Sequence, residues 1–228
     1  MSRPRTQAER LAATRAALLR EARAIFAIQG YQAAGTEEIV RRAKVTRGAL
    51  YHHFRDKRDL FEAVFEDVAR QIAGTIDDMA VPVADPIDAL IEGTRAFLDA
   101  CLDPAVRRIY LIDAPAVLGW HRWREIDAPH GVRSLREGLA AVLAARPVPG
   151  LALEPATFLL SGAFNEAALW VAEAKDEKEA RRDMDRALTI LIQRLFAAPQ
   201  SPPARAPVSP AHRAAPRAGP HRSPRSRP

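Results

Sequence analysis

The 228-residue sequence contains a single cysteine and no apolar run long enough to cross a membrane. One thiol, Cys101, cannot form an internal disulfide or build a cysteine-based metal site. A transmembrane helix needs about twenty consecutive apolar residues, so no membrane segment is predicted. The first residues are charged and lack the apolar stretch of a secretory signal. We therefore expect a soluble, cytoplasmic protein with no membrane partner.

The sequence also lacks the short motifs that mark common catalytic sites. It has no GxSxG nucleophile elbow, no P-loop, no GxGxxG turn and no HExxH zinc motif. Its six histidines are scattered along the chain. We therefore expect no enzyme activity, no cofactor and no bound metal.

Charge is distributed unevenly along the chain. Residues 1–60 carry 13 basic and 6 acidic side chains, whereas residues 61–198 carry 15 basic and 22 acidic ones. The last thirty residues hold six arginines, no acid and nine prolines. A basic first segment followed by an acidic one indicates that the first meets a polyanion. The proline-rich end cannot bury enough apolar surface to fold, so we expect residues 199–228 to be a disordered tail.

Apolar residues recur at helical spacing almost throughout, and capping signals recur between the apolar stretches. Thr6 with Glu9 is a capping box, Gly30 is a helix stop, and Asp85, Asp103 and Glu154 each precede a proline suited to the first helical turn. Pro129 should kink the helix that contains it. We expect an all-α fold of about nine helices, near 6–29, 35–42, 47–53, 57–79, 86–101, 104–112, 119–145, 155–174 and 177–197.

The most informative stretch runs from Gly35 to Lys57. It predicts two short helices that are unstable alone and need the first helix behind them. Ile39, Val45, Leu50 and Phe54 would close this three-helix core. The second short helix would then present its N-terminal residues outward, as a recognition helix presents them to base edges in the major groove. Arg47 is the long donor there, and its guanidinium matches guanine O6 and N7.

These residues resemble the tetracycline-repressor-like (TetR) family of transcriptional regulators. The resemblance covers about residues 10–65 and is carried by Phe26, Gly30-Tyr31, Ile39-Val40, Ala43, the run Val45-Thr46-Arg47-Gly48-Ala49-Leu50-Tyr51-His52-His53-Phe54, Lys57 and Leu60. Two positions depart from the family pattern. Lys44 stands where the family usually has glycine in the turn, and Ala34-Gly35 stands where it usually has a Thr/Ser pair.

The resemblance implies DNA contacts by named residues. Tyr51, His52 and Lys57 would contact phosphates, Arg47 and Thr46 would read bases, and the small side chains of Gly48 and Ala49 would allow close approach to the groove. Lys44 and Thr36 complete the predicted DNA-binding set. Arg3 and Arg5 either reach a minor groove or belong to an unordered terminus.

The resemblance also implies a divergent helical second domain that dimerises and binds a ligand. We therefore expect a helix-turn-helix domain over 1–56 and an effector-binding and dimerisation domain over 57–198. Apolar seams at 4-3-4 spacing would build a four-helix bundle across a two-fold axis, or would face the core of a single chain. The seams are Leu160, Phe164, Ala167 and Val171, and Met184, Leu188, Leu191 and Leu195.

Polar and aromatic side chains set in apolar helices are candidates for the ligand site, although each is equally compatible with an ordinary core. The candidates are Phe97, Cys101, Tyr110, Trp120, Trp123, Phe164 and Asn165.

We therefore predict a homodimeric repressor that binds a palindromic operator in double-stranded DNA and is released by a small-molecule effector of unknown identity. The long helix near 57–79 would be the lever between ligand and DNA. The alternative is a non-specific or architectural DNA-binding protein that uses the basic first domain and the arginine-rich tail.

Overall fold

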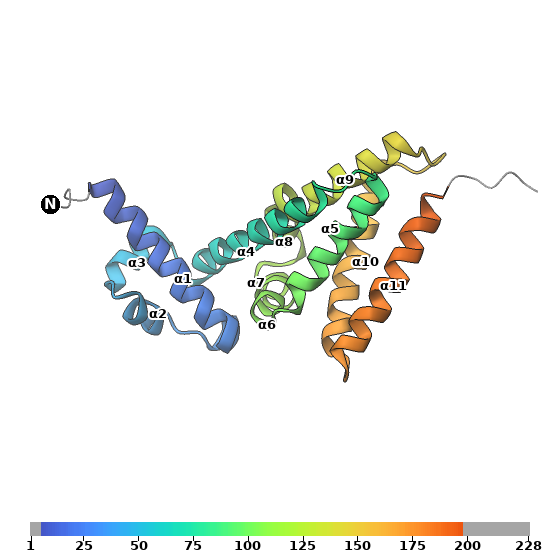
Figure 1. The fold of residues 1–228 in the computed structure, drawn as a ribbon. Coiled ribbons are helices and arrows are strands. Elements are labelled where there is room, and N and C mark those ends of the chain that lie inside the picture. Colours follow the sequence, from blue (N-terminus) through green and yellow to red (C-terminus); the bar gives the residue numbers. More distant parts are fainter. Residues whose placement is uncertain (1–5, 198–228) are drawn as a thin grey trace, which may run out of the picture. The chain divides into compact units, whose positions relative to one another are not determined.

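The computed structural model describes residues 6–197, and within that range it contains helices and connecting turns but no strand. Three segments join end to end at 104–118 and three more at 120–145, so residues 6–197 contain nine continuous helical stretches. Figure 1 shows their arrangement. The expected all-α fold is confirmed. The elements are α1 (Gln7–Ala33), α2 (Thr36–Ala43), α3 (Arg47–His53), α4 (Lys57–Ala80), α5 (Pro86–Leu102), α6 (Pro104–Arg107), η1 (Arg108–Asp113), α7 (Ala114–Leu118), α8 (Trp120–Asp127), η2 (Ala128–Val132), α9 (Arg133–Ala145), α10 (Leu153–Glu173) and α11 (Glu177–Leu195).

Helix α1 begins and bends where the sequence predicts. The Thr6 hydroxyl accepts from the Glu9 backbone N–H, and the Glu9 carboxylate accepts from that of Thr6, so both halves of the capping box form. Gly30 has a φ of 76°, which interrupts the helix, and one further turn follows. This positive φ is strained for any residue with a Cβ, so the backbone at Gly30 favours glycine.

Helices α2 and α3 pack against α1 and form the three-helix unit (Figure 1). The predicted core residues Ile39, Leu50 and Phe54 are buried, together with Leu18, Ala22, Ile25 and Phe26 of α1. Val45 is half-buried against the same core. Helix α3 is held at its start by Thr46, whose hydroxyl accepts from the Ala49 backbone N–H at 3.1 Å. Two turns of helix are stable here because α1 buries their apolar face.

Helix α4 leads from this unit into the rest of the fold and packs along α5. Its buried face includes Phe61, Phe65, Val68 and Ile72, as the sequence pattern predicts. Helix α5 starts at Asp85, whose carboxylate accepts from the Ile87 backbone N–H at 2.8 Å ahead of a proline in the first turn.

Two π-helical segments, η1 and η2, interrupt the middle of the chain. Pro129 lies in η2, and the next residue, His130, has non-helical angles of −118° and −107°. The predicted kink is therefore present. A π-helical turn is rare, and it is found frequently at functional sites.

The predicted dimer seam on α10 is wrong. Phe164, Ala167 and Val171 are buried within the chain itself, so they cannot meet a second copy. Helix α11 is mixed: Leu188 is buried, whereas Leu191 and Leu195 are exposed. A 4-3-4 pattern identifies an apolar face but does not tell which neighbour covers it.

No helix among residues 6–197 is long and apolar enough to cross a membrane. Arg3, Arg5 and the predicted tail, 199–228, lie outside the described residues.

Candidate nucleic-acid interface and ligand cavity

The outer face of α3 carries most of the residues expected to meet DNA. Thr46, Arg47, Gly48, Tyr51 and His52 are exposed. Ala49 is half-buried. A Cβ at Gly48 would find its nearest neighbour 3.9 Å away, at the Thr46 hydroxyl, so the protein itself does not require glycine there. The open space above Gly48 lets another molecule approach the backbone of α3 closely.

Arg47 is placed by two neighbours. Its Nη1 donates to Glu37 Oε1 at 2.8 Å, and its guanidinium lies 5.6 Å from the centre of the Tyr51 ring. The side chains of both Arg47 and Glu37 are about two-thirds exposed, so this ion pair is weak and is readily exchanged for another partner.

Lys44 ends α2 in a left-handed conformation, with φ 57° and ψ 40°. It is the one non-glycine residue with positive φ among those described. This geometry explains why glycine is usual at this position of the family pattern: a Cβ makes the left-handed region unfavourable. The Lys44 side chain is exposed at the turn between α2 and α3.

Lys57 and Thr36 lie differently from the residues of α3. The Lys57 ammonium donates to the backbone carbonyls of Tyr31 at 2.8 Å and Ala34 at 3.0 Å, and so ties the start of α4 to the end of α1. These bonds occupy donors that a phosphate would need, so its DNA contact stays a prediction. Thr36 is half-buried in the first turn of α2.

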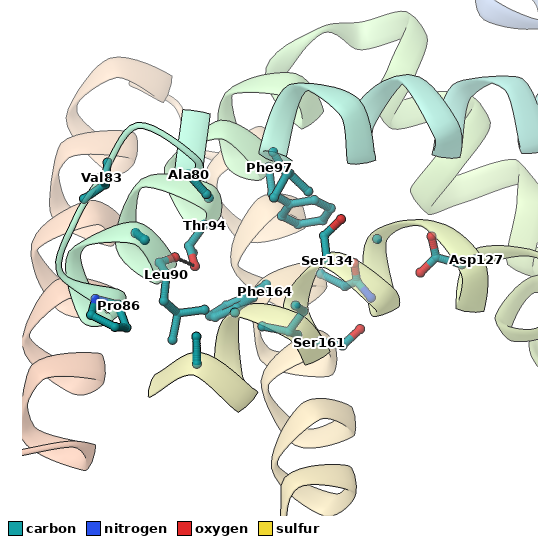
Figure 2. A pocket seen from close by; sticks show the side chains of 18 of the residues that line it. Ala80, Val83, Pro86, Leu90, Thr94, Phe97, Asp127, Ser134, Ser161 and Phe164 are labelled. Carbon is teal, nitrogen blue, oxygen red and sulfur yellow. Dashed lines mark hydrogen bonds between the residues drawn. The ribbon is translucent and has the colours of Figure 1, made fainter. Parts of the chain in front are cut away.

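A cavity of about 300 Å³ lies among α4, α5, η1, η2, α9 and α10 (Figure 2). Its wall is mainly apolar, with a few polar groups that converge on it, as is usual for small-molecule sites. The polar lining residues are Thr94, Tyr110, Asp127, Ser134, Ser161 and Asn165.

Four of the seven residues expected at the ligand site line this cavity: Phe97, Tyr110, Phe164 and Asn165. The other three do not line it, so the cavity gives them no role. Cys101 is fully buried. Trp123 is buried, and its indole N–H donates to the Tyr110 carbonyl at 3.2 Å. Trp120 is 61% exposed. Trp120 and Trp123 were both predicted because they are close in the sequence, but of the two only Trp123 is buried.

Burial raises the pKa of the Cys101 thiol to about 12. The reactive form of cysteine is the thiolate, so this thiol is inert near neutral pH. Its environment is that of a small buried apolar side chain, which is the ordinary role of a free cysteine.

Sequence reasoning missed Asp127, whose side chain is only 2% exposed. The Tyr110 hydroxyl donates to Asp127 Oδ1 at 2.8 Å. Burial raises the pKa of Asp127, while the Tyr110 and Gly131 hydrogen bonds and the nearby Arg124 and His130 act against that rise. No local spacing marks Asp127, because Gly131 lies within the π-helical segment η2 and the partner Tyr110 comes from η1.

The cavity is connected to the helix-turn-helix unit through η1. Tyr110 of η1 lines the cavity, and Asp113 at the end of η1 accepts the Tyr31 backbone N–H at 2.8 Å. On the same segment, the Arg108 guanidinium lies against Gly30, where a Cβ would meet it. The end of α1 therefore lies against the segment that lines the cavity.

Two family models match the chain. Residues 18–64 match the model described as "Bacterial regulatory proteins, tetR family", and residues 87–195 match that of the "Tetracyclin repressor-like, C-terminal domain". Among curated proteins, the Tn10 TetC protein of Escherichia coli is 26% identical over 173 residues, which cover 76% of this chain and 86% of TetC. The regulator AcrR of Shigella flexneri is 33% identical over 43% of this chain, and that match spans 46% of AcrR.

Comparison with solved structures also finds members of the TetR family. A TetR-family transcriptional regulator from Pectobacterium atrosepticum is 31% identical and has a TM-score of 0.70, over 86% of this chain and 100% of that one. A TetR-family structure from Shewanella sp. PV-4 has a TM-score of 0.64 at 21% identity, over 77% and 95% of the two chains, and so shows the fold. The helix-turn-helix unit and helical remainder define a DNA-binding transcriptional regulator. The chain belongs to the TetR family of these regulators.

Proposed function

We propose that this regulator is a homodimeric repressor that a small-molecule effector releases from a palindromic operator. Residues 1–56 would bind DNA, and residues 57–198 would bind the effector and the second copy. The observation that carries this proposal is the position of η1, which lines the cavity with Tyr110 and holds the end of α1 with Asp113.

The DNA contacts would come from the exposed face of α3 and its surroundings. Arg47 would exchange Glu37 for guanine O6 and N7, and Thr46 would add a second base contact. Tyr51, His52, Lys44, Thr36 and Lys57 would contact phosphates, and Gly48 with Ala49 would let α3 approach the bases. The two copies of α3 would enter successive major grooves, about 34–36 Å apart.

The second copy would cover apolar side chains on α10 and α11. Six of the thirteen large apolar side chains that are exposed within residues 6–197 lie on these two helices: Phe158, Leu159, Trp170, Ile190, Leu191 and Leu195. Exposed apolar surface of this kind marks an interface, because a monomer gains by removing it from water. A pair of helices from each copy makes a four-helix bundle with closed two-fold symmetry.

The effector would act on α1 through η1. An occupant of the cavity contacts Tyr110, and a displacement of η1 moves the acceptor for the Tyr31 N–H. Tyr31 in turn is bound through its carbonyl to Lys57 at the start of α4. The separation of the two α3 helices would then change, because α1 and α4 both pack on the helix-turn-helix core.

A selection of genome fragments by the purified full chain at two salt concentrations tests the DNA-binding part. Recovery of one palindromic site at high salt supports the repressor. Recovery of random fragments that disappear as salt rises supports the non-specific alternative, because phosphate contacts alone are strongly salt-dependent. Deletion of residues 199–228 should leave site discrimination intact.

Sedimentation analysis tests the dimer. We expect Leu191→Glu to shift the protein to monomers, because it places a charge on the proposed interface. Ile28→Glu is the matched control, since Ile28 is an equally exposed apolar side chain on α1. A monomeric wild type, or no effect of Leu191→Glu, contradicts this interface.

A further inference from the structure

The cavity has an acidic end and an apolar end. Asp127 lies at one side of the view in Figure 2, while Val83, from the connection between α4 and α5, and Pro86, the first residue of α5, lie at the other. Between them the wall is mostly apolar, with Leu90, Phe97 and Phe164. An occupant that fits this wall has a mainly apolar body and a polar group at the Asp127 end.

Asp127 is the one charged side chain among the buried residues of 6–197. Transfer of a carboxylate from water into an apolar interior is costly unless an opposite charge accompanies it. Within the described range, no basic side chain forms an ion pair with Asp127. Its Oδ1 accepts the Tyr110 hydroxyl, and no side-chain donor of residues 6–197 reaches Oδ2.

Arg124, the basic side chain that most favours the charged form of Asp127, already has other partners. Arg124 donates to the Ser161 hydroxyl at 2.8 Å, and its guanidinium lies over the rings of Trp120 and Trp123 at 4.8 and 4.9 Å. It favours the charged form of Asp127 from a distance but does not line the cavity. His130, the other nearby basic group, does not line it either. The carboxylate is therefore the charge that an occupant meets.

Access to this carboxylate depends on Gly131. A Cβ at this position would lie 3.2 Å from Asp127 Oδ1, 3.3 Å from the Tyr110 hydroxyl oxygen and 3.6 Å from Asp127 Oδ2. Because glycine has no side chain, the space beside all three oxygens stays open. A donor group that enters the cavity can reach them.

We propose that the cavity binds a small organic cation, an apolar body that carries a protonated amine and pairs with Asp127. The inference rests on the proposed ligand-binding function and names the chemical class of the effector. An anionic effector is disfavoured because its charge would meet a carboxylate that has no ion-pair partner among residues 6–197. A neutral hydroxyl can donate one hydrogen bond, but it leaves the buried charge in place.

A matched series of probes tests the proposal on the full chain. Phenylbutylamine, phenylbutanol and phenylvalerate share a phenyl group on the same four-carbon chain and end in an ammonium, a hydroxyl and a carboxylate. We expect calorimetry at neutral pH to show the amine binding about tenfold more tightly than the alcohol, and the carboxylate binding more weakly than both.

Two variants assign that preference to Asp127. Asp127→Asn keeps the shape and should reduce the amine-to-alcohol affinity ratio to about one. Glu125→Gln removes an exposed carboxylate of the same helix and should leave the ratio unchanged. Gly131→Ala keeps the Asp127 carboxylate but narrows the space beside it. This variant should reduce the affinity for the amine more than the affinity for the alcohol. Circular dichroism confirms that each variant is folded.

The outcomes separate this inference from the proposed function. If the alcohol binds as tightly as the amine, or if Asp127→Asn retains the preference, the cationic class is wrong while the cavity remains a ligand site. If none of the three probes binds, both the cationic class and the ligand-binding role of this cavity are contradicted.

Discussion

The backbone N–H of Tyr31 donates a 2.8 Å hydrogen bond to Asp113 Oδ2 across 82 positions of the sequence. The bond joins the last turn of α1 to the end of η1. The carbonyl of the same residue, Tyr31, accepts from the Lys57 ammonium at 2.8 Å. The backbone of Tyr31, next to the bend at Gly30, therefore links the helix-turn-helix unit to both the long helix α4 and the cavity-lining segment η1.

Removal of the Asp113 carboxylate should weaken this connection. Asp113→Ala leaves the partly buried Tyr31 N–H unpaired, which we expect to cost about 1–3 kcal/mol of unfolding free energy. Denaturant unfolding measures this loss, and hydrogen exchange at the Tyr31 amide should become faster. Asp99→Ala is the control, because the Asp99 carboxylate is exposed where it pairs with Arg181, and its loss should cost under about 1 kcal/mol. Equal losses for the two variants would contradict a special role for the Tyr31–Asp113 bond.

Arg47 should carry sequence discrimination. Arg47→Ala is expected to reduce affinity for the selected operator by about 1–3 kcal/mol and to relax one base position. Binding to a panel of single-base operator variants measures this. Arg41→Ala removes a similarly exposed guanidinium from α2 and should not relax any base position. If Arg47→Ala lowers affinity equally for every sequence, Arg47 contacts phosphate and not a base.

Gly48 should be required by DNA and not by the protein. Gly48→Ala places a methyl group in open space, so it should stabilise the short helix α3 by about 0.5–1 kcal/mol. On DNA the same methyl group should lower affinity, because it separates α3 from the groove. Thermal unfolding and operator binding are measured on the same preparation. A gain in stability with unchanged DNA affinity would show that Gly48 does not face the groove.

Lys44 offers a pair of variants that separates backbone strain from charge. Lys44→Gly relieves the left-handed conformation and should stabilise the protein by about 0.5–1 kcal/mol. If Lys44 contacts phosphate, both Lys44→Gly and the more αL-tolerant Lys44→Asn should reduce the salt dependence of DNA binding by about one unit of slope. An unchanged salt slope in both variants would remove Lys44 from the DNA contacts.

Asp127 should reduce stability at neutral pH. Its pKa is raised by burial, so the folded state favours the protonated carboxyl. The protonated Asp127 carboxyl therefore stabilises the folded state fully at pH values below the pKa that Asp127 has in the unfolded chain. This stabilisation is lost as the pH rises through the pKa of Asp127 in the folded protein. Asp127→Asn, which stays neutral, should raise the melting temperature by more at about pH 8 than at about pH 5.

Asp185 is the control, because its pKa is shifted in the opposite direction from that of Asp127. Its hydrogen bond from Arg95 lowers the pKa of Asp185, so ionisation stabilises the folded state. Asp185→Asn should therefore lower the melting temperature, and by more as pH rises. A pH-independent effect of Asp127→Asn would contradict the raised pKa.

Local signals in the sequence were sufficient for the helices and for the helix-turn-helix unit. Thr6 with Glu9, Gly30 and Thr46 act on neighbours within four positions, so their effect can be read without a fold. The core of the three-helix unit followed from apolar spacing, because two short helices have few ways to bury Ile39, Leu50 and Phe54 against one long helix.

The cavity could be predicted only in part. Phe97, Tyr110, Phe164 and Asn165 stood out as aromatic or polar residues in apolar helices, but so did Cys101, Trp120 and Trp123. Tyr110 lies within η1 and Asp127 directly precedes η2, and the local sequence signals did not predict either π-helical segment. The seam on α10 has a different cause: spacing along the chain identifies an apolar face but not the neighbour that covers it, and this face lies in the core.

The sequence by itself determined the class of protein, the helical segments and the residues of the recognition helix, because each depends on contacts between near neighbours or on one dense motif. The tertiary structure decided which polar groups share the cavity, that the buried Asp127 has no ion-pair partner among residues 6–197, and that Tyr31 is bound to Asp113. These features depend on side chains brought together from distant helices, and no spacing along the chain encodes that distance.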